Sequence, residues 1–199
     1  TEEAQAIDSA SRGRIKALVS RGDFAGKTGD TQLLTNLPGV KATRVLLVGL
    51  GNRKNYRRKI WRRACTAAIN ALARTRIRTA AIAIERPPAS ELDDYYFGKA
   101  VAEITGAALY RVNDLKSSKK PKPPALNRIV AGPVRATGAA AARRGLEHGQ
   151  ATALAMTVQR DLANLPGNVC TPSYLADRAR AIGKRYSSVR VQVLDEAAI

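Results

Sequence analysis

The sequence predicts an α/β protein: a three-layer N-terminal domain built on a parallel sheet, a long connecting helix, and the first helix and strand of a second α/β unit. Two observations predict this fold. Short apolar runs alternate with longer segments in which apolar residues recur at helical spacing. Such alternation is typical of strands joined by crossover helices. A long Ala-rich segment then separates this region from a final helix and an alternating run.

The first fifty residues predict one helix and two strands. Apolar residues gather on one side of residues 3–20, and Arg21–Gly22 ends this helix. Two β-rich runs follow, Thr31–Leu37 and Arg44–Leu50, with Pro38–Gly39 as the turn between them. The second run is almost entirely apolar, as expected for a strand that is covered on both faces.

Two amphipathic helices and two further strands come next. Residues 56–73 form a helix with these core-facing side chains: Trp61, Ala64, Cys65, Ala68 and Leu72. The run Thr79–Ile84 is a third strand. Residues 91–110 form the next helix, with this apolar stripe: Tyr96, Phe97, Ala100, Val101, Ile104 and Ala108. A strand near Leu126–Ala131 follows.

We expect the chain to divide into three regions. Residues 1–136 form the N-terminal domain, residues 137–165 the connecting helix, and residues 166–199 the start of a second domain. A helix of ~28 residues spans about 40 Å at 1.5 Å per residue. Three glycines interrupt this helix: Gly138, Gly145 and Gly149. Each costs about 1 kcal/mol relative to Ala where it is interior.

The C-terminal region begins with residues that end one helix and start the next. Pro166–Gly167 ends the long helix, and Thr171–Pro172 supplies an N-cap and an N1 proline for a helix over residues 172–185. The run Val189–Leu194 alternates as a strand does. A helix and a strand with nothing to pack on are not a finished domain, so we expect the second domain to continue past Ile199.

The charge is strongly positive and unevenly spread. Lys and Arg number 34 against 16 Asp and Glu, a formal net charge of +18. The window between Asp30 and Glu85 contains twelve bases and no acid, and a second basic group lies at Lys116–Lys122. Such clusters attract polyphosphates, so we name six candidate nucleic-acid-binding residues: Arg53, Lys54, Arg57, Arg58, Arg62 and Arg63. The alternative is a solvated helix face whose charge is offset elsewhere.

Several classes of site and protein are excluded. No run approaches ~18 consecutive apolar residues, which excludes a membrane-spanning helix. Cys65 and Cys170 cannot build a disulfide framework or a four-ligand zinc site, and so few cysteines fit a reducing cytoplasm. The fragments Gly26–Lys27–Thr28 and Gly49–Leu50–Gly51 are incomplete phosphate-binding motifs. His148 has no Cys or His nearby in sequence, so no catalytic or metal-binding residue is assigned.

The segment Arg160–Ala176 is the most specific part of the sequence. It combines an Arg-Asp-Leu-x-Asn-x-Pro-x-Asn run with Thr-Pro-x-x-Leu-Ala. This pattern resembles the signature at the entrance of the catalytic domain of the leucyl (cytosol) aminopeptidases. The matching positions are Arg160, Asp161, Leu162, Asn164, Pro166, Asn168, Thr171, Pro172, Leu175 and Ala176. Residues 21–27 and 44–51 also resemble the N-terminal domain of this family.

The resemblance implies a macro-like α/β N-terminal domain with a mixed, mostly parallel sheet, within a cytoplasmic homohexamer. Family members remove N-terminal amino acids from peptides with two divalent metals, commonly zinc or manganese, and metal-bound water as nucleophile. Their metal ligands lie in the C-terminal domain, in Phe-Asp-x-Gly-Gly and Asn-Thr-Asp-Ala-Glu-Gly-Arg runs. Neither run occurs in this sequence.

We therefore expect this chain alone to be inactive and to serve hexamer assembly and access to the active site. In some bacterial family members the N-terminal domain also contributes to DNA binding. Two alternatives follow for the basic cluster: a DNA-binding module, or a non-catalytic structural subunit of a basic assembly.

Overall fold

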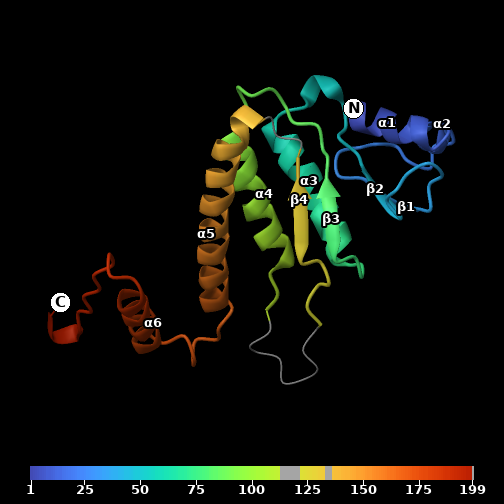
Figure 1. Cartoon of the computed structure of the whole chain (residues 1–199). Coiled ribbons are helices and arrows are strands. Elements are labelled where there is room, and N and C mark those ends of the chain that lie inside the picture. Colours follow the sequence, from blue (N-terminus) through green and yellow to red (C-terminus); the bar gives the residue numbers. More distant parts are fainter. Residues whose placement is uncertain (113–121, 133–135, 199) are drawn as a thin grey trace.

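The computed structural model describes residues 1–112, 122–132 and 136–198 (Figure 1). The elements, in chain order, are α1 (Glu2–Ala10), α2 (Arg14–Ser20), β1 (Thr31–Thr35), β2 (Arg44–Val48), the one-turn 3-10 helix η1 (Arg53–Asn55), α3 (Arg58–Ala73), β3 (Thr79–Ile82), α4 (Asp94–Leu109), β4 (Arg128–Ala131), η2 (Ala136–Gly138), α5 (Ala139–Ala163), α6 (Pro172–Arg185) and η3 (Glu196–Ala198). The predicted α/β class is confirmed. Most of the predicted basic group Lys116–Lys122 lies outside the described residues.

The strands form two pairs, where the sequence had suggested one mostly parallel sheet. β3 and β4 are parallel, with Ala80 opposite Ile129. β1 and β2 are antiparallel, with Leu33 opposite Leu46. The difference follows from the connections. A short loop can only return a strand antiparallel, whereas the segment between β3 and β4 contains α4 and is long enough for a parallel crossover.

The predicted N-terminal helix is two helices. Arg12 and Gly13 between α1 and α2 adopt positive φ angles of 56° and 77°, which end one helix before the next begins. Asp8 stabilises the new helix, because its Oδ1 accepts hydrogen bonds from the backbone N–H groups of Ile15 (2.8 Å) and Lys16 (2.9 Å). The expectation of a single helix over residues 3–20 is therefore wrong.

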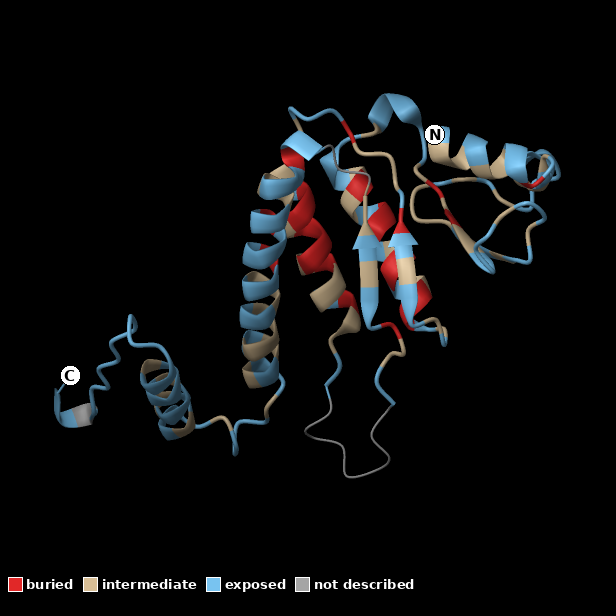
Figure 2. Ribbon diagram, in the orientation of Figure 1, coloured by how far each residue is buried: buried red, intermediate tan, exposed pale blue. Residues whose placement is uncertain are grey.

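The hydrophobic core lies between α3, α4 and the β3–β4 pair (Figure 2). Trp61 and Ile69 of α3 are fully buried, and the Trp61 ring packs against Phe97 of α4 at 5.7 Å between ring centroids. The predicted core face of α3 is confirmed. On α4 the predicted stripe is also buried except for Tyr96, which is 49% exposed. Tyr96 instead contacts the neighbouring Tyr95 ring edge-on.

α5 packs along α4, and the two helices run parallel (Figure 1). Glycines allow this close approach. A Cβ at Gly98 of α4 would overlap the backbone of Ala142, and a Cβ at Gly145 or Gly149 of α5 would overlap the backbone of α4. The glycines that cost helix propensity are thus required by the contact between the helices.

α6 forms as predicted, with Thr171 as N-cap accepting from the Tyr174 N–H at 3.3 Å. It lies apart from the sheets and from α3 and α4 (Figure 1). The predicted strand Val189–Leu194 is not formed, because no described segment lies beside it to complete a hydrogen-bonded ladder. Several apolar side chains of this region are exposed: Val169, Leu175, Ile182, Tyr186, Val189, Val191, Val193 and Leu194.

Among the described residues, every helix is too short or too polar to cross a bilayer. The region boundaries at residues 136 and 165 stay predictions. We call the described part of residues 1–163 the α/β body.

Candidate functional site

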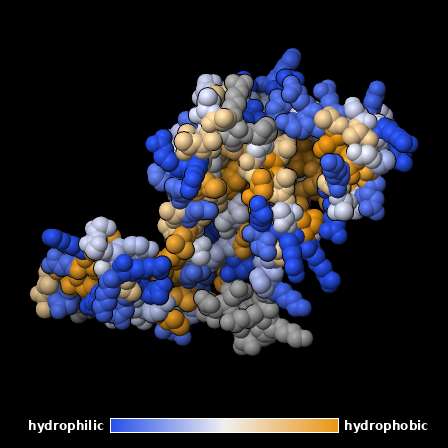
Figure 3. Space-filling view, in the orientation of Figure 1, coloured by the Kyte–Doolittle hydropathy of each residue, from blue (hydrophilic) through white to orange (hydrophobic). Residues whose placement is uncertain are grey.

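The six predicted nucleic-acid-binding residues gather around the start of α3. Arg53 and Lys54 lie on η1, Arg57 directly precedes α3, and the other three lie on the first two turns of α3: Arg58, Arg62 and Arg63. All are exposed except Arg62, which is half-buried. Figure 3 shows a strongly hydrophilic surface where η1 projects from the α/β body. The structure therefore brings the six residues to one end of the molecule.

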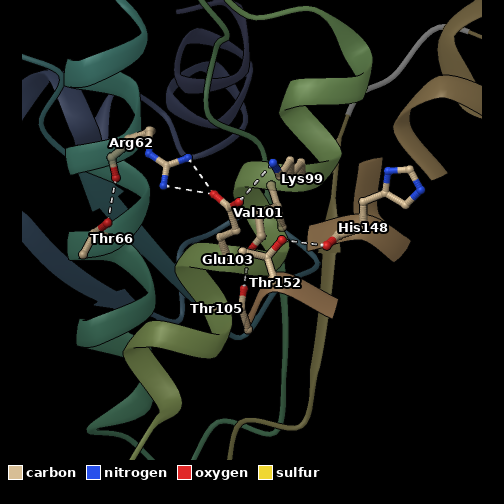
Figure 4. A network of polar contacts seen from close by, with 8 residues as sticks. All are labelled: Arg62, Thr66, Lys99, Val101, Glu103, Thr105, His148 and Thr152. Carbon is tan, nitrogen blue, oxygen red and sulfur yellow. Dashed lines mark hydrogen bonds and ion pairs between the residues drawn. The ribbon is translucent and has the colours of Figure 1, made fainter. Parts of the chain in front are cut away.

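Two of these six bases form ion pairs within the chain. Arg57 Nε lies 3.0 Å from a carboxylate oxygen of Glu91. Arg62 Nη1 lies 3.3 Å from Glu103, whose other oxygen lies 3.7 Å from Lys99 (Figure 4). Both acids come from the sequence after the acid-free window. Tertiary folding therefore offsets part of the charge that appeared unbalanced along the chain.

The other four bases, Arg53, Lys54, Arg58 and Arg63, form no ion pair with the residues that the structure describes. Within the part of the chain that the structure describes, no exposed aromatic ring on η1 or α3 accompanies them. Trp61 is buried, and the Tyr56 hydroxyl donates to the Glu85 carbonyl oxygen. Burial also raises the pKa of Tyr56 well above its usual value, so the hydroxyl stays a neutral donor. Single-stranded nucleic acids are commonly bound by base stacking on aromatic rings, which this cluster does not offer.

The two incomplete phosphate motifs lie side by side and bind each other. Gly29 N–H donates to Gly49 O (2.9 Å), and Gly51 N–H donates to Gly26 O (2.9 Å). A Cβ at Gly49 would overlap the backbone of Gly26 and Lys27. These amide groups are engaged within the protein, so the glycines serve loop packing here.

The titratable side chains do not assemble a metal centre in the described ranges. Those ranges contain no group of three or more His, Cys, Asp or Glu residues placed to bind a metal ion. They therefore do not fit the two divalent metals that the family resemblance implies. His148 Nδ1 lies 2.9 Å from the Tyr95 hydroxyl. Burial raises the pKa of Cys65 to about 12, which makes this thiol a poor nucleophile.

The signature segment contributes a different cluster, at the ends of α4 and α5. Three of its side chains, from Arg160, Asp161 and Asn164, surround Tyr110, the residue that follows α4. We call these four residues the Tyr110 cluster. The sequence pattern marked Arg160, Asp161 and Asn164 but contained no sign of Tyr110, because their contact spans about fifty residues of chain.

Comparisons of this chain with known proteins all match it to one family. A family model described as the N-terminal domain of the cytosol aminopeptidase family matches residues 1–119. A probable cytosol aminopeptidase of Alkalilimnicola ehrlichii is 41% identical over 192 residues, covering 96% of this chain and 39% of that protein. The cytosol aminopeptidase of Pseudomonas aeruginosa is 36% identical, covering 97% and 39%. The chain thus spans about two fifths of the length of these relatives.

Two solved structures share the fold. A mutant of tomato leucine aminopeptidase superposes with a TM-score of 0.76 at 25% identity, covering 98% of this chain and 37% of that one. The bottromycin maturation enzyme BotP superposes with a TM-score of 0.69 at 26% identity, covering 92% and 37%. The similarity to the tomato enzyme includes α6 as well as the α/β body, since it extends over 98% of the chain.

Proposed function

The chain belongs to the cytosol aminopeptidase family, and from this premise we propose that it is the N-terminal portion of an enzyme that removes N-terminal amino acids from peptides in the cytosol. One observation carries the proposal: the similarity to a cytosol aminopeptidase extends at 41% identity over 96% of the chain. A chance match of a single motif would not run through both the α/β body and α6.

We propose that the role of this portion is architectural: it supports assembly of a homohexamer and shapes the access of peptides to the active site. The described residues offer buried packing, ion pairs and exposed apolar side chains, which suit assembly. A pair of manganese or zinc ions, bound by the remainder of the enzyme, would polarise the peptide carbonyl.

The test compares this 199-residue chain with the longer protein of which it would be the N-terminal portion. With leucine p-nitroanilide and added Mn²⁺, we expect turnover from the longer protein and none from the chain alone. Sedimentation analysis of the longer protein should give six copies. Turnover by the chain alone, or an inactive longer protein that is folded and metal-loaded, would contradict the proposal.

A second candidate function is DNA binding through Arg53, Lys54, Arg58 and Arg63. The observation that favours it is their shared exposure at one end of the molecule, without an ion pair among the described residues. Binding through about four phosphates should weaken about 100-fold between about 50 and 200 mM salt. Arg63→Ala should reduce this slope by about one, and Arg178→Ala on α6 should not. The absence of a gel shift at low salt would eliminate the idea.

A further inference from the structure

Tyr110 contacts three side chains at the point where α4 and α5 both end. Its hydroxyl donates to Asp161 Oδ1 (3.0 Å) and accepts from Asn164 Nδ2 (3.3 Å). The Arg160 guanidinium carbon lies 5.3 Å from the centre of the Tyr110 ring, which is a cation–π distance. Partial desolvation and the hydrogen bond to Asp161 raise the pKa of Tyr110, so the hydroxyl keeps its proton at neutral pH.

The same side chains also bind backbone carbonyl groups at the helix ends. Arg160 Nη1 donates to Ala107 O in the last turn of α4 (3.5 Å). Asn164, the C-cap of α5, donates from Nδ2 to Arg160 O (2.7 Å). Carbonyl groups at helix C-termini lack partners within the helix and favour donors and cations. The Tyr110 cluster therefore terminates both helices at once and fixes the end of α5 against α4.

Beyond this cluster the chain leaves the α/β body. The segment from Leu165 to Cys170 turns on itself, because Val169 N–H and Cys170 N–H both donate to Pro166 O (2.9 Å each). The backbone N–H of Leu165 donates to Leu162 O in the last turn of α5 (3.2 Å). No hydrogen bond or ion pair between described residues joins 166–198 to the α/β body. Among the described residues, Asn164 is thus the last one along the chain whose side chain forms a polar contact with the α/β body.

We propose that Tyr110 is a positioning residue, which through Asp161 and Asn164 sets the direction in which residues 165–171 lead α6 away from the α/β body. In this proposal the signature residues Arg160, Asp161 and Asn164 help to orient residues 165–171 and α6 relative to the α/β body. The proposal rests on contacts in this chain and does not depend on the proposed enzymatic activity.

The chain contains suitable native probes for this orientation. Trp61 is its one tryptophan and lies in the core of the α/β body. Cys170 lies in the departing segment, while the other thiol, Cys65, is buried with a pKa raised to about 12. A maleimide dye should therefore label Cys170 selectively. Time-resolved energy transfer from Trp61 to this dye then measures the distance, and its spread, between the body and the departing segment.

We expect Tyr110→Phe to broaden this distance distribution markedly, and Asp161→Ala, which removes the same hydrogen bond from the other side, to do the same. Tyr174→Phe is the matched control, since it makes the same chemical change on α6, and it should leave the distribution unchanged. An unchanged distribution in both Tyr110→Phe and Asp161→Ala would overturn the proposal. So would a broadening accompanied by an altered Trp61 emission maximum, because the body itself would then have changed.

Discussion

Glu103 binds two bases, Arg62 on α3 and Lys99 one turn earlier on its own helix (Figure 4). Its side chain is only 17% exposed, so its charge is partly desolvated and depends on both partners. We expect Glu103→Gln to lower the free energy of unfolding by about 1–2 kcal/mol, between the values typical of exposed and buried pairs. Urea denaturation measures this change.

The control for this change is Glu147→Gln. Glu147 pairs with Arg143 on α5, and both side chains are well exposed. The loss there should stay below about 0.5 kcal/mol. If the two variants lose the same stability, the Glu103 network contributes no more than a surface pair.

The buried thiol of Cys65 should make the free energy of unfolding decrease at alkaline pH. Burial raises its pKa from 9.0 to about 12 in the folded chain. A group whose folded pKa is raised stabilises the fold below its unfolded pKa, and this contribution is lost as the pH rises through the folded value. Stability should therefore fall between about pH 9 and 12, and Cys65→Ala should flatten this part of the profile. Denaturation midpoints at several pH values measure it, and an unchanged slope would contradict it.

At the scale of residues, the sequence predicted what repeats at a fixed spacing and missed what depends on distant partners. The burial of Trp61 and Cys65 follows from helical periodicity, and it is confirmed. The pairing of Arg57 with Glu91 and of Arg62 with Glu103 spans tens of residues and exists only in the folded chain. Two of the six bases are therefore paired in the structure, so the unpaired positive charge of the cluster is smaller than the sequence suggested.

At the scale of elements, the parallel pair α4–α5 places like dipole ends together. Acids lie at the shared N-terminal end, where Asp93 caps α4 and Asp94 lies against Gly138. Bases lie at the shared C-terminal end, where Arg111 Nη1 donates to Ala108 O (2.9 Å) and Tyr110 O (2.7 Å). These charges offset the repulsion that two parallel helix dipoles would otherwise produce.

The contact between α4 and α5 predicts an unusual response to a helix-favouring substitution. Gly149→Ala should raise the helix propensity of α5 by about 1 kcal/mol. Yet its Cβ would overlap the carbonyl oxygen of Lys99. Because overpacking against a backbone typically costs about 1–3 kcal/mol, we expect a net loss of stability and a lower Tm.

Gly167→Ala is the matched control for Gly149→Ala, since nothing lies within 4 Å of its Cβ position. It should change the Tm little. A Gly149→Ala variant at least as stable as the parent chain would show that α4 and α5 can separate at no cost.

Helices and strands were predicted correctly where the local sequence pattern determines them. The predictions failed where strand pairing or a left-handed backbone conformation determines the structure. Helix 172–185 was predicted from Thr171–Pro172 and is confirmed. The run Val189–Leu194 alternates as a strand does, but no strand among the described residues pairs with it. The break between α1 and α2 depends on a positive φ at Arg12, which side-chain periodicity does not reveal.

At the scale of the whole molecule, the net charge of +18 should make stability depend on salt. Excess like charge disfavours the compact state, and salt screens this repulsion between exposed groups. We expect the Tm to rise by several degrees as NaCl is raised from about 20 to 500 mM, where the Debye length falls below about 5 Å. Calorimetry measures this. A Tm that falls instead would show that the ion pairs outweigh the net repulsion.

The family was evident in the sequence from the segment Arg160–Ala176, whereas its structural use was not. The family is confirmed by the comparisons, and the similarity to one relative extends over 96% of the chain. The place of the segment at the entrance of a catalytic domain stays a prediction. The contacts of this segment with Tyr110 at the end of α5 could be found only in the structure, because no sequence pattern links Tyr110 to the segment. The six-base cluster remains a prediction for nucleic-acid contact.

The glycine contacts between α4 and α5 also differ in whether a second mutation can repair them. At Gly106 the obstacle to a methyl group is the side chain of Ala153, so Gly106→Ala has a simple intragenic suppressor, Ala153→Gly. At Gly145 the obstacle is the carbonyl oxygen of Tyr95, which every amino acid carries. No single replacement at Tyr95 can then restore the fit, and revertants of Gly145→Ala should return to glycine itself.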